Sequence, residues 1–250
     1  MHTDPALLPR RTTIRGVHVT LEPLDAGTHA DALYAASGHP QHVALWDYVV
    51  DGPFADRRSF DEMILRKAAS DDPLYFAIID HRSGAAAGYA ALMRMDPVHR
   101  VIEIGYILFT PGLQRTTGAT EAIYLLARHV FDDLGYRRFE WKCDSRNEPS
   151  RRAAVRFGFT FEGTFRQHML VKGRNRDTNW FSIVDTEWPA RKERMERWLA
   201  PENFDGHGRQ RQPLSAIACT PGGADVAFHN AHSAATNHRA SETIRRNDVG

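Results

Sequence analysis

The residues from Glu103 to Phe159 constrain the fold of this 250-residue chain more than any other part of it. They predict, in order, a strand, a short polar turn, a helix, a second strand and a second helix. The first strand, 101–109, is apolar on almost every side chain except the carboxylate of Glu103. After the turn, the apolar run from Ile123 to Leu134 indicates a helix. This alternation of strand and helix predicts an α/β core.

The turn between the first strand and its helix is typical of a site for phosphate. Small and hydroxyl-bearing residues lead directly into the helix, so unpaired backbone N–H groups are expected at the positive end of the helix dipole. The residues expected to contact phosphate are Gln114, Arg115, Thr116, Thr117, Gly118, Ala119 and Thr120. The alternative interpretation is an ordinary entry into a helix without phosphate binding.

Glu103 is the candidate catalytic base of the chain. Its apolar neighbours Ile102 and Ile104 indicate a largely buried strand, and a buried carboxylate requires a partner or a task. One interpretation is an ordinary ion pair, or a position at the edge of the sheet. The other is a general base that takes a proton, directly or through water, from a group held near the bound phosphate-bearing molecule.

Taken together, these residues resemble the GNAT acyltransferases. The resemblance lies in Glu103 on a strand, the turn Gln114-x-x-Thr117-x-Ala119, Asn147-x-x-Ser150 and the segment 156–159, in this order. The chain is most similar to the RimJ/RimL-type branch, whose members transfer acetyl from acetyl-CoA to an amine. The resemblance covers roughly residues 12 to 200. One departure is that Thr117 stands where the family usually has glycine, and the glycine of this turn comes one place later.

The resemblance also implies how acetyl-CoA binds. The main chain of Ile107, Leu108 and Phe109 is expected to pair with the pantetheine arm where the strand splays from its neighbour at a bulge. Backbone N–H groups near Leu108 would polarise the thioester carbonyl. Asn147 is expected near the pantetheine and Ser150 near the sulfur, where Ser150 would donate a proton as CoA leaves. Helix capping is the alternative interpretation for both residues.

The function implied is an acetyl-CoA-dependent N-acetyltransferase in which a primary amine attacks the thioester directly. The sequence leaves the acceptor open between the N-terminus of a protein and a small molecule such as an amino acid, a polyamine or an aminoglycoside. An acyl-CoA-binding module without turnover is the alternative from another class of protein. A homodimer is a further partnership that the sequence leaves open.

The rest of the chain is expected to complete one mixed, mostly antiparallel sheet flanked by helices, in a domain spanning 12–203. Further strands are expected at 17–24, 75–80, 87–95, 138–144, 160–171 and 178–185, and helices at 25–37, 56–70, 117–134, 149–157 and 189–199. Beyond Asn203 bulky apolar residues become sparse, so 204–250 is predicted to be a flexible tail. Whether that tail has no function, or targets the protein or binds a partner, stays open.

Composition argues against several classes of protein. A net charge of +1 and a hydrophobic content of 42% indicate a globular protein with no global attraction to nucleic acid or membrane. No apolar run approaches the ~18 residues of a membrane span. Cys143 and Cys219 lie in unlike contexts, so we expect no disulfide and a reducing cytoplasm. The spacing of histidines and cysteines predicts no metal site.

Overall fold

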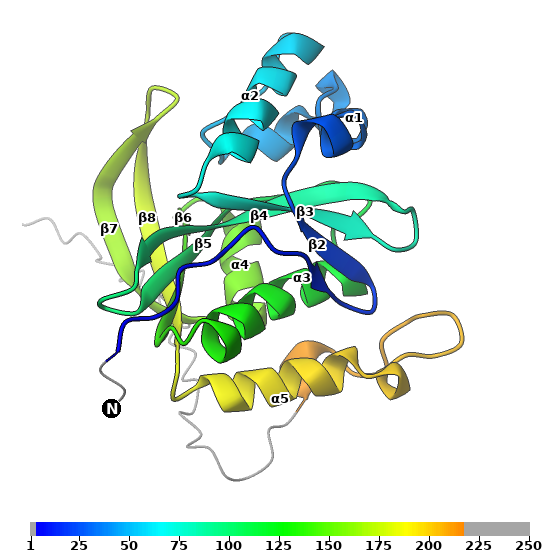
Figure 1. Cartoon of the computed structure of the whole chain (residues 1–250), viewed down its shortest axis with the longest axis vertical. Coiled ribbons are helices and arrows are strands. Elements are labelled where there is room, and N and C mark those ends of the chain that lie inside the picture. The colour runs from blue at the N-terminus through cyan, green and yellow to red at the C-terminus, as the bar shows by residue number, and fades with distance from the viewer. Residues whose placement is uncertain (1–3, 218–250) are drawn as a thin grey trace, which may run out of the picture.

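The computed structural model describes residues 4–217, which form an eight-stranded sheet with helices on both faces (Figure 1). The strands are β1 (Ile14–Arg15), β2 (Val19–Pro23), β3 (Leu74–Asp80), β4 (Ala85–Asp96), β5 (Val101–Phe109), β6 (Arg138–Asp144), β7 (Thr160–Val171) and β8 (Arg174–Val184). The helices are α1 (Ala26–Ser37), α2 (Arg57–Ala69), α3 (Thr117–Arg128), α4 (Glu148–Arg156) and α5 (Trp188–Leu199), with a 3-10 helix, η1, at Pro40–Trp46. Strand order is β1-β2-β3-β4-β5-β6-β8-β7, and of these pairs β5 and β6 alone are parallel within residues 4–217. The predicted fold class is confirmed.

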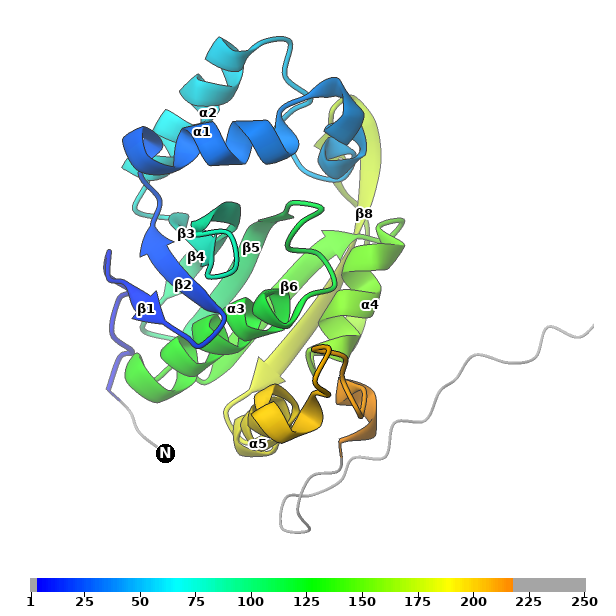
Figure 2. The same ribbon diagram turned by 90° about the vertical axis from the view of Figure 1, so that its right-hand side faces the viewer.

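Two hydrophobic cores form because successive side chains of a strand point to opposite faces of the sheet. On β3, Phe76 and Ile78 belong to one core, whereas Tyr75 and Ala77 belong to the other. The first core is covered by α3 and α5, and the second by α1 and α2. Figure 2 shows the sheet between these two layers, with α1 and α2 above it and α3 and α5 below.

The sheet opens between β5 and β6, as the resemblance implied. These strands pair from Val101 opposite Arg138 to Ile104 opposite Trp141, and no further. At this point the register between β4 and β5 shifts, and Tyr106 adopts a φ of 49°, in the left-handed region. An extra residue in one strand bends that strand and increases its twist. The end of β5 therefore stays paired with β4 while it leaves β6.

Two elements end differently from the prediction. The helix expected at 117–134 is α-helical only to Arg128, and a π-helical segment, His129–Asp133, completes it. The last strand, expected from residue 178, already begins at Arg174, so the loop between β7 and β8 is shorter than predicted. Lys172 and Gly173 have φ values of 50° and 71°, the positive values that a two-residue turn between twisted antiparallel strands requires.

The predicted boundary at residue 203 is too early, because the chain remains packed on the domain to residue 217. Leu214 and Ile217 are buried in the core that α5 covers. The indole Nε1 of Trp198 donates to Oε1 of Gln210 at 3.0 Å, and Phe204 pairs with Gln210 in an isolated bridge. A few well-placed apolar residues thus suffice to order a polar segment. The rest of the predicted tail, 218–250, lies outside the described residues.

Replacing Leu214 with alanine should destabilise the protein by about 2–5 kcal/mol, the usual cost of removing a fully buried leucine side chain. The measurement is urea unfolding followed by circular dichroism. Ser215→Ala is the matched control, because Ser215 is exposed and neighbours Leu214 in the chain. Equal midpoints for both variants and the wild type would mean that this segment does not contribute to the core.

Candidate active site

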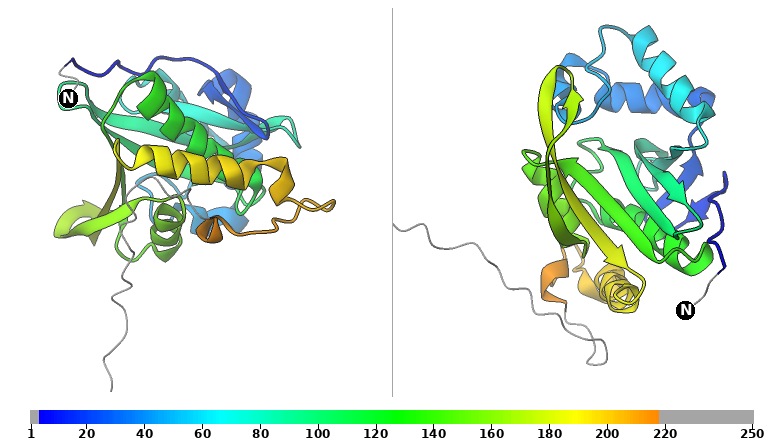
Figure 3. Two further views of the ribbon diagram at one scale, coloured as in Figure 1. Left: turned by 90° about the horizontal axis from the view of Figure 1, so that it is seen from below. Right: turned by 90° about the vertical axis from the view of Figure 1, so that its left-hand side faces the viewer.

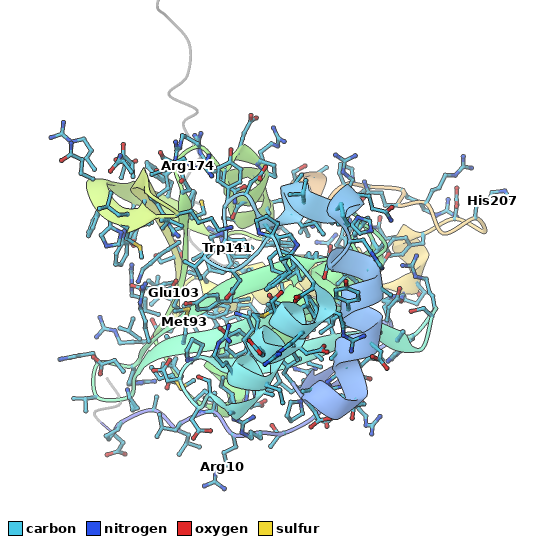
Figure 4. The ribbon with its side chains drawn as sticks, turned by 90° about the horizontal axis from the view of Figure 1, so that it is seen from above. Arg10, Met93, Glu103, Trp141, Arg174 and His207 are labelled. Carbon is cyan, nitrogen blue, oxygen red and sulfur yellow. The ribbon has the colours of Figure 1, made fainter. Side chains whose placement is uncertain are left out.

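A cleft lies where β5 and β6 separate, between the strand that carries Glu103 and the strand that carries Trp141. Its walls also include residues of β4, β7 and β8, the first turn of α4, and the segment after η1. Figure 4 views the molecule from the side of α1 and α2, with Met93, Glu103 and Trp141 labelled in neighbouring strands. The bulge in β5 and the end of its pairing with β6 therefore create this site.

Glu103 borders the cleft and is only 4% exposed. Its Oε2 atom accepts from Nη1 of Arg94 at 2.8 Å and lies 2.9 Å from Nζ of Lys142. Arg94 is presented from a second irregularity, in β4, where its φ is 49° and its N–H donates to Asp72. The ion pair considered from the sequence is thus present, in a position that also borders the cleft.

The charges around Glu103 continue across the sheet as an alternating series. Nζ of Lys142 also pairs with Glu140 at 2.8 Å, Arg138 pairs with Glu140 at 2.7 Å, and Arg138 pairs with Glu162 of β7. Nζ of Lys142 lies 3.7 Å from the ring centroid of Trp180. Each buried charge in this series has an opposite charge beside it, which is the condition for keeping it buried.

The other side of the cleft is formed by the start of α4. Asn147 caps the helix, and its Oδ1 accepts from the N–H of Ser150 at 3.1 Å. The hydroxyl oxygen of Ser150 accepts from Nε1 of Trp141 at 3.0 Å. This leaves the Ser150 proton available to a third group. Cys143 lies beside Ser150: burial raises the pKa of the Cys143 thiol, and the hydrogen bond with Ser150 partly offsets that rise. Capping of α4 by Asn147 is therefore present, together with a hydroxyl that faces the cleft.

The turn before α3 is held by its own polar groups. Nε2 of Gln114 donates to the carbonyl of Phe109 at 2.9 Å. Oγ1 of Thr116 donates to the carbonyl of Leu113 and accepts from the N–H of Ala119, so Thr116 is the N-cap of α3. These bonds fix the turn against the end of β5.

Three N–H groups of this turn, those of Arg115, Thr117 and Gly118, have no hydrogen-bond partner within residues 4–217. Arg115 reaches this geometry with a φ of 61°. Two of the three groups lie in the first turn of α3, at the positive end of its dipole. N–H groups in this position are able to donate to the oxygens of a phosphate group.

The glycine of the turn has a packing role. A Cβ atom at Gly118 would lie 2.8 Å from Cγ1 of Val19, on the neighbouring strand β2. Thr120 is also directed inward: it is 1% exposed, and its Oγ1 accepts from Arg156 of α4 at 3.0 Å. Gly118 therefore lets α3 approach β2, and Thr120 ties α3 to α4. Their side-chain positions face the interior.

Glu121 has a structural function that sequence reasoning missed. Its carboxylate accepts from the N–H groups of Val17, His18 and Val19 at 2.8, 2.6 and 2.8 Å, and so holds the turn between β1 and β2. Gly16 is required beside it, since a Cβ atom there would lie 2.5 Å from Oε2 of Glu121. The signal in the sequence was a carboxylate within an otherwise apolar helix.

The segment after η1 covers the side of the cleft that α1 and α2 face. Nζ of Lys172, at the tip of the β7–β8 hairpin, donates to the carbonyls of Trp46 and Asp51, both at 2.7 Å. The carboxylate of Asp51 pairs at 2.7 Å with Lys67, whose pKa is lowered by burial. Figure 3 shows the hairpin tip reaching this segment in its right-hand view. The segment that covers the cleft is thus held by Lys172 on one side and by Lys67 on the other.

Comparison with known proteins places this fold and site in a family. The model of the acetyltransferase (GNAT) domain matches residues 18–160. A crystal structure of a GCN5-related N-acetyltransferase from Brucella melitensis has 51% sequence identity and a TM-score of 0.84, covering 86% of this chain and 97% of that one. The chain belongs to the GNAT acetyltransferases, which makes it an acetyl-CoA-dependent transferase.

Two relatives indicate the branch of that family. "Putative ribosomal N-acetyltransferase YdaF" of Bacillus subtilis is 26% identical over 70% of this chain and 96% of its own length. The ribosomal-protein-serine acetyltransferase of Escherichia coli is 30% identical over 40% of this chain and 56% of its own length. These similarities confirm the RimJ/RimL-like branch.

Two further findings concern the described part of the chain. None of its helices is long and apolar enough to cross a membrane. Within residues 4–217 there is also no group of three or more His, Cys, Asp or Glu side chains that could hold a metal ion.

Glu121→Ala should destabilise the fold by about 1–3 kcal/mol or more, because three backbone N–H groups would lose their acceptor and the buried one, that of Val19, would be left unsatisfied. Chemical denaturation measures the change. The control is Glu62→Ala, which removes an exposed ion pair with Arg58 and should cost less than about 1 kcal/mol. A Glu121→Ala protein as stable as the control would assign the β1–β2 turn to other contacts.

Thr117→Glu should abolish stabilisation by CoA, because a carboxylate at the start of α3 would repel the phosphates. In the wild type, CoA at ~100 times its dissociation constant should add about 2.7 kcal/mol of stability. Thermal unfolding with and without CoA measures both effects, and Thr117→Gln is the neutral control of the same size. If CoA stabilises the Glu and Gln variants equally, the phosphates bind elsewhere.

Proposed function

We propose that this protein acetylates a primary amine by direct attack of the amine on the thioester of acetyl-CoA. The observation that carries the proposal is the gap through the sheet between β5 and β6, with Glu103 at one side and Ser150 at the other. The two groups that the reaction needs, a proton acceptor and a proton donor, therefore border one cleft. An acyl-CoA-binding module without turnover would have no use for this pair.

Acetyl-CoA would bind along the turn before α3 and the free edge of β5. The N–H groups of Arg115, Thr117 and Gly118 would receive its pyrophosphate, since they have no partner within residues 4–217. Beyond Ile104, β5 has no pairing with β6, so the main-chain groups of 107–109 that point away from β4 could hydrogen-bond the pantetheine arm, apart from the carbonyl of Phe109, which already accepts from Gln114. An N–H near Leu108 would polarise the thioester carbonyl.

The reaction then requires two proton transfers. The amine nitrogen forms a bond to the acetyl carbon, and the bond between that carbon and the CoA sulfur breaks. Glu103 would take the proton that the ammonium must lose before it attacks, directly or through water. Ser150 would give a proton to the departing thiolate, because its oxygen already accepts from Trp141 and its own proton remains to be donated.

The charges of the cleft bear on the acceptor. Glu103 pairs with Arg94 and Lys142, and Asp144 receives three hydrogen bonds from Arg146. A cleft whose carboxylates are already neutralised attracts polyamines and aminoglycosides weakly. The names of the two relatives that mention ribosomes or ribosomal proteins favour a protein N-terminus as the acceptor.

Glu103→Gln should lower kcat roughly 10²–10⁴-fold near neutral pH, with CoA affinity almost unchanged, because it removes the proton acceptor and keeps the shape. The defect should shrink as pH rises through the pKa of the acceptor amine, since the amine then arrives neutral and needs no base. The measurement is a pH–rate profile of CoA release with one active acceptor. A defect of constant size at every pH would assign Glu103 a positioning role.

The matched control is Glu140→Gln, which removes the other carboxylate paired with Lys142 and leaves Glu103 in place. It should change the rate far less than Glu103→Gln, and equal losses would mean that both residues only balance the lysine. Ser150→Ala should cost less than Glu103→Gln, because thiolate is a tolerable leaving group, and its defect should persist at high pH.

A further inference from the structure

Of the arginine and lysine side chains on the cleft wall, Arg176 is the one without a carboxylate within 4 Å in the described part of the chain. Its side chain borders the cleft from β8, and its Nε donates to the hydroxyl of Thr178 at 3.2 Å. The other arginine and lysine side chains of the wall, Arg94 and Lys142, both contact Glu103. Arg176 thus lines the cleft with its guanidinium nitrogens largely unused.

The carboxylates near Arg176 already have other hydrogen-bond and ion-pair partners. Asp144 lines the cleft and is influenced by Arg176, but both of its oxygens are bonded to Arg146 at 2.9–3.2 Å. Burial alone would raise the pKa of Asp144, yet the hydrogen bonds from Arg146 and the charge of Arg176 together lower it. Among the paired groups, the cations Arg94, Lys142, Arg146 and Arg138 balance the carboxylates Glu103, Glu140, Asp144 and Glu162. Arg176 adds one positive charge that none of these carboxylates balances.

Strand geometry places Arg176 on the acceptor side. Along β8, residues two apart share a face, so Arg176, Thr178 and Trp180 point the same way. The Trp180 ring contacts Nζ of Lys142, which in turn binds Glu103. Arg176 therefore shares the face of the sheet that carries the proposed base. Ser150, Asn147 and the turn before α3, where CoA would bind, belong to the opposite face.

An unpaired guanidinium in a cleft is a strong site for an anionic oxygen group. It offers several N–H donors in a planar arrangement that fits carboxylate or phosphate with two parallel hydrogen bonds. Its charge has a second effect on catalysis, because a nearby positive charge favours the neutral form of an amine over its ammonium form. The same residue would therefore bind the acceptor and help to keep its amine nucleophilic.

We infer that Arg176 selects acceptors in which the reacting amine is accompanied by a carboxylate or phosphate group. The inference rests on the proposed N-acetylation and adds the chemical class of the acceptor. Two sources of the anionic group fit this chemistry: the acidic side chain of a residue that follows a peptide N-terminus, and the α-carboxylate of a free amino acid. Polycationic amines are disfavoured in both cases.

The test compares acceptors that differ only in charge. The panel consists of the dipeptide amides Ser-Asp, Ser-Asn and Ser-Lys, and of free serine against serinamide, with kcat/KM measured from CoA release. Charge-assisted hydrogen bonds contribute about 1.5–3 kcal/mol, so at least one anionic acceptor should exceed its neutral partner about 10–100-fold. A preference within the dipeptides assigns the anion to a side chain, and a preference for free serine assigns it to the α-carboxylate.

Substitutions of Arg176 test whether this residue causes the preference for anionic acceptors. Arg176→Gln should reduce the ratio between the anionic and neutral acceptors to near one, Arg176→Lys should retain part of it, and Arg176→Glu should favour Ser-Lys. The control is Arg174→Gln, at an exposed position of the same hairpin outside the cleft, which should keep the wild-type ratio. Stabilisation by CoA checks that each variant is folded.

Two results would overturn the inference separately from the proposed function. Wild-type enzyme that acetylates the panel without regard to charge, or a preference that survives in Arg176→Gln, contradicts the role of Arg176 and leaves N-acetylation standing. Acetylation of no acceptor in the panel or in a wider set of amines, although CoA binds, contradicts the proposed function and the inference with it.

Discussion

The structure depends on a sheet that is closed at one end and open at the other. The pairing between β5 and β6 stops at Ile104 and Trp141, and the shift of register opposite β4 directs the rest of β5 away. Backbone groups that leave a ladder must find other partners, so an opening of this kind is costly unless something fills it. Gln114 satisfies one such group, the carbonyl of Phe109. A bound ligand is the natural partner for others.

The alternating charges lie where the two strands begin to part. Lys142 bridges Glu103 of β5 and Glu140 of β6, so it links the two strands by side chains near the end of their backbone pairing. Breaking a buried pair by removing one partner costs about 3–5 kcal/mol, because the other charge stays buried and uncompensated. The same carboxylate can therefore hold the strands together and face the cleft. The structural role of Glu103 is therefore compatible with the role proposed for it as a base, since both need an ionised carboxylate.

The sequence predicts what is local and misses what the fold assembles. The order of elements around Glu103 and the helix entry at Thr116 follow from residue patterns within a few turns of chain. Arg94 and Lys142 could not be assigned to Glu103, because they come from two other strands that meet β5 only in the sheet. Likewise, the packing of Leu214 depends on the shape of the core beneath α5.

The two faces of the opening differ in character, and this difference organises the chemistry. On the side of α4 the polar groups are neutral: Ser150, Asn147 and the thiol of Cys143, with an indole N–H from Trp141. On the side of α1 and α2 the groups are charged, and the cover held by Lys172 lies over them. In the proposed reaction, a thiolate formed on the neutral side would be met by hydroxyl and dipole donors, whereas an ammonium on the charged side would have a carboxylate to accept its proton. Under this proposal, the sheet would separate the two proton transfers, and acyl transfer through the gap would connect them.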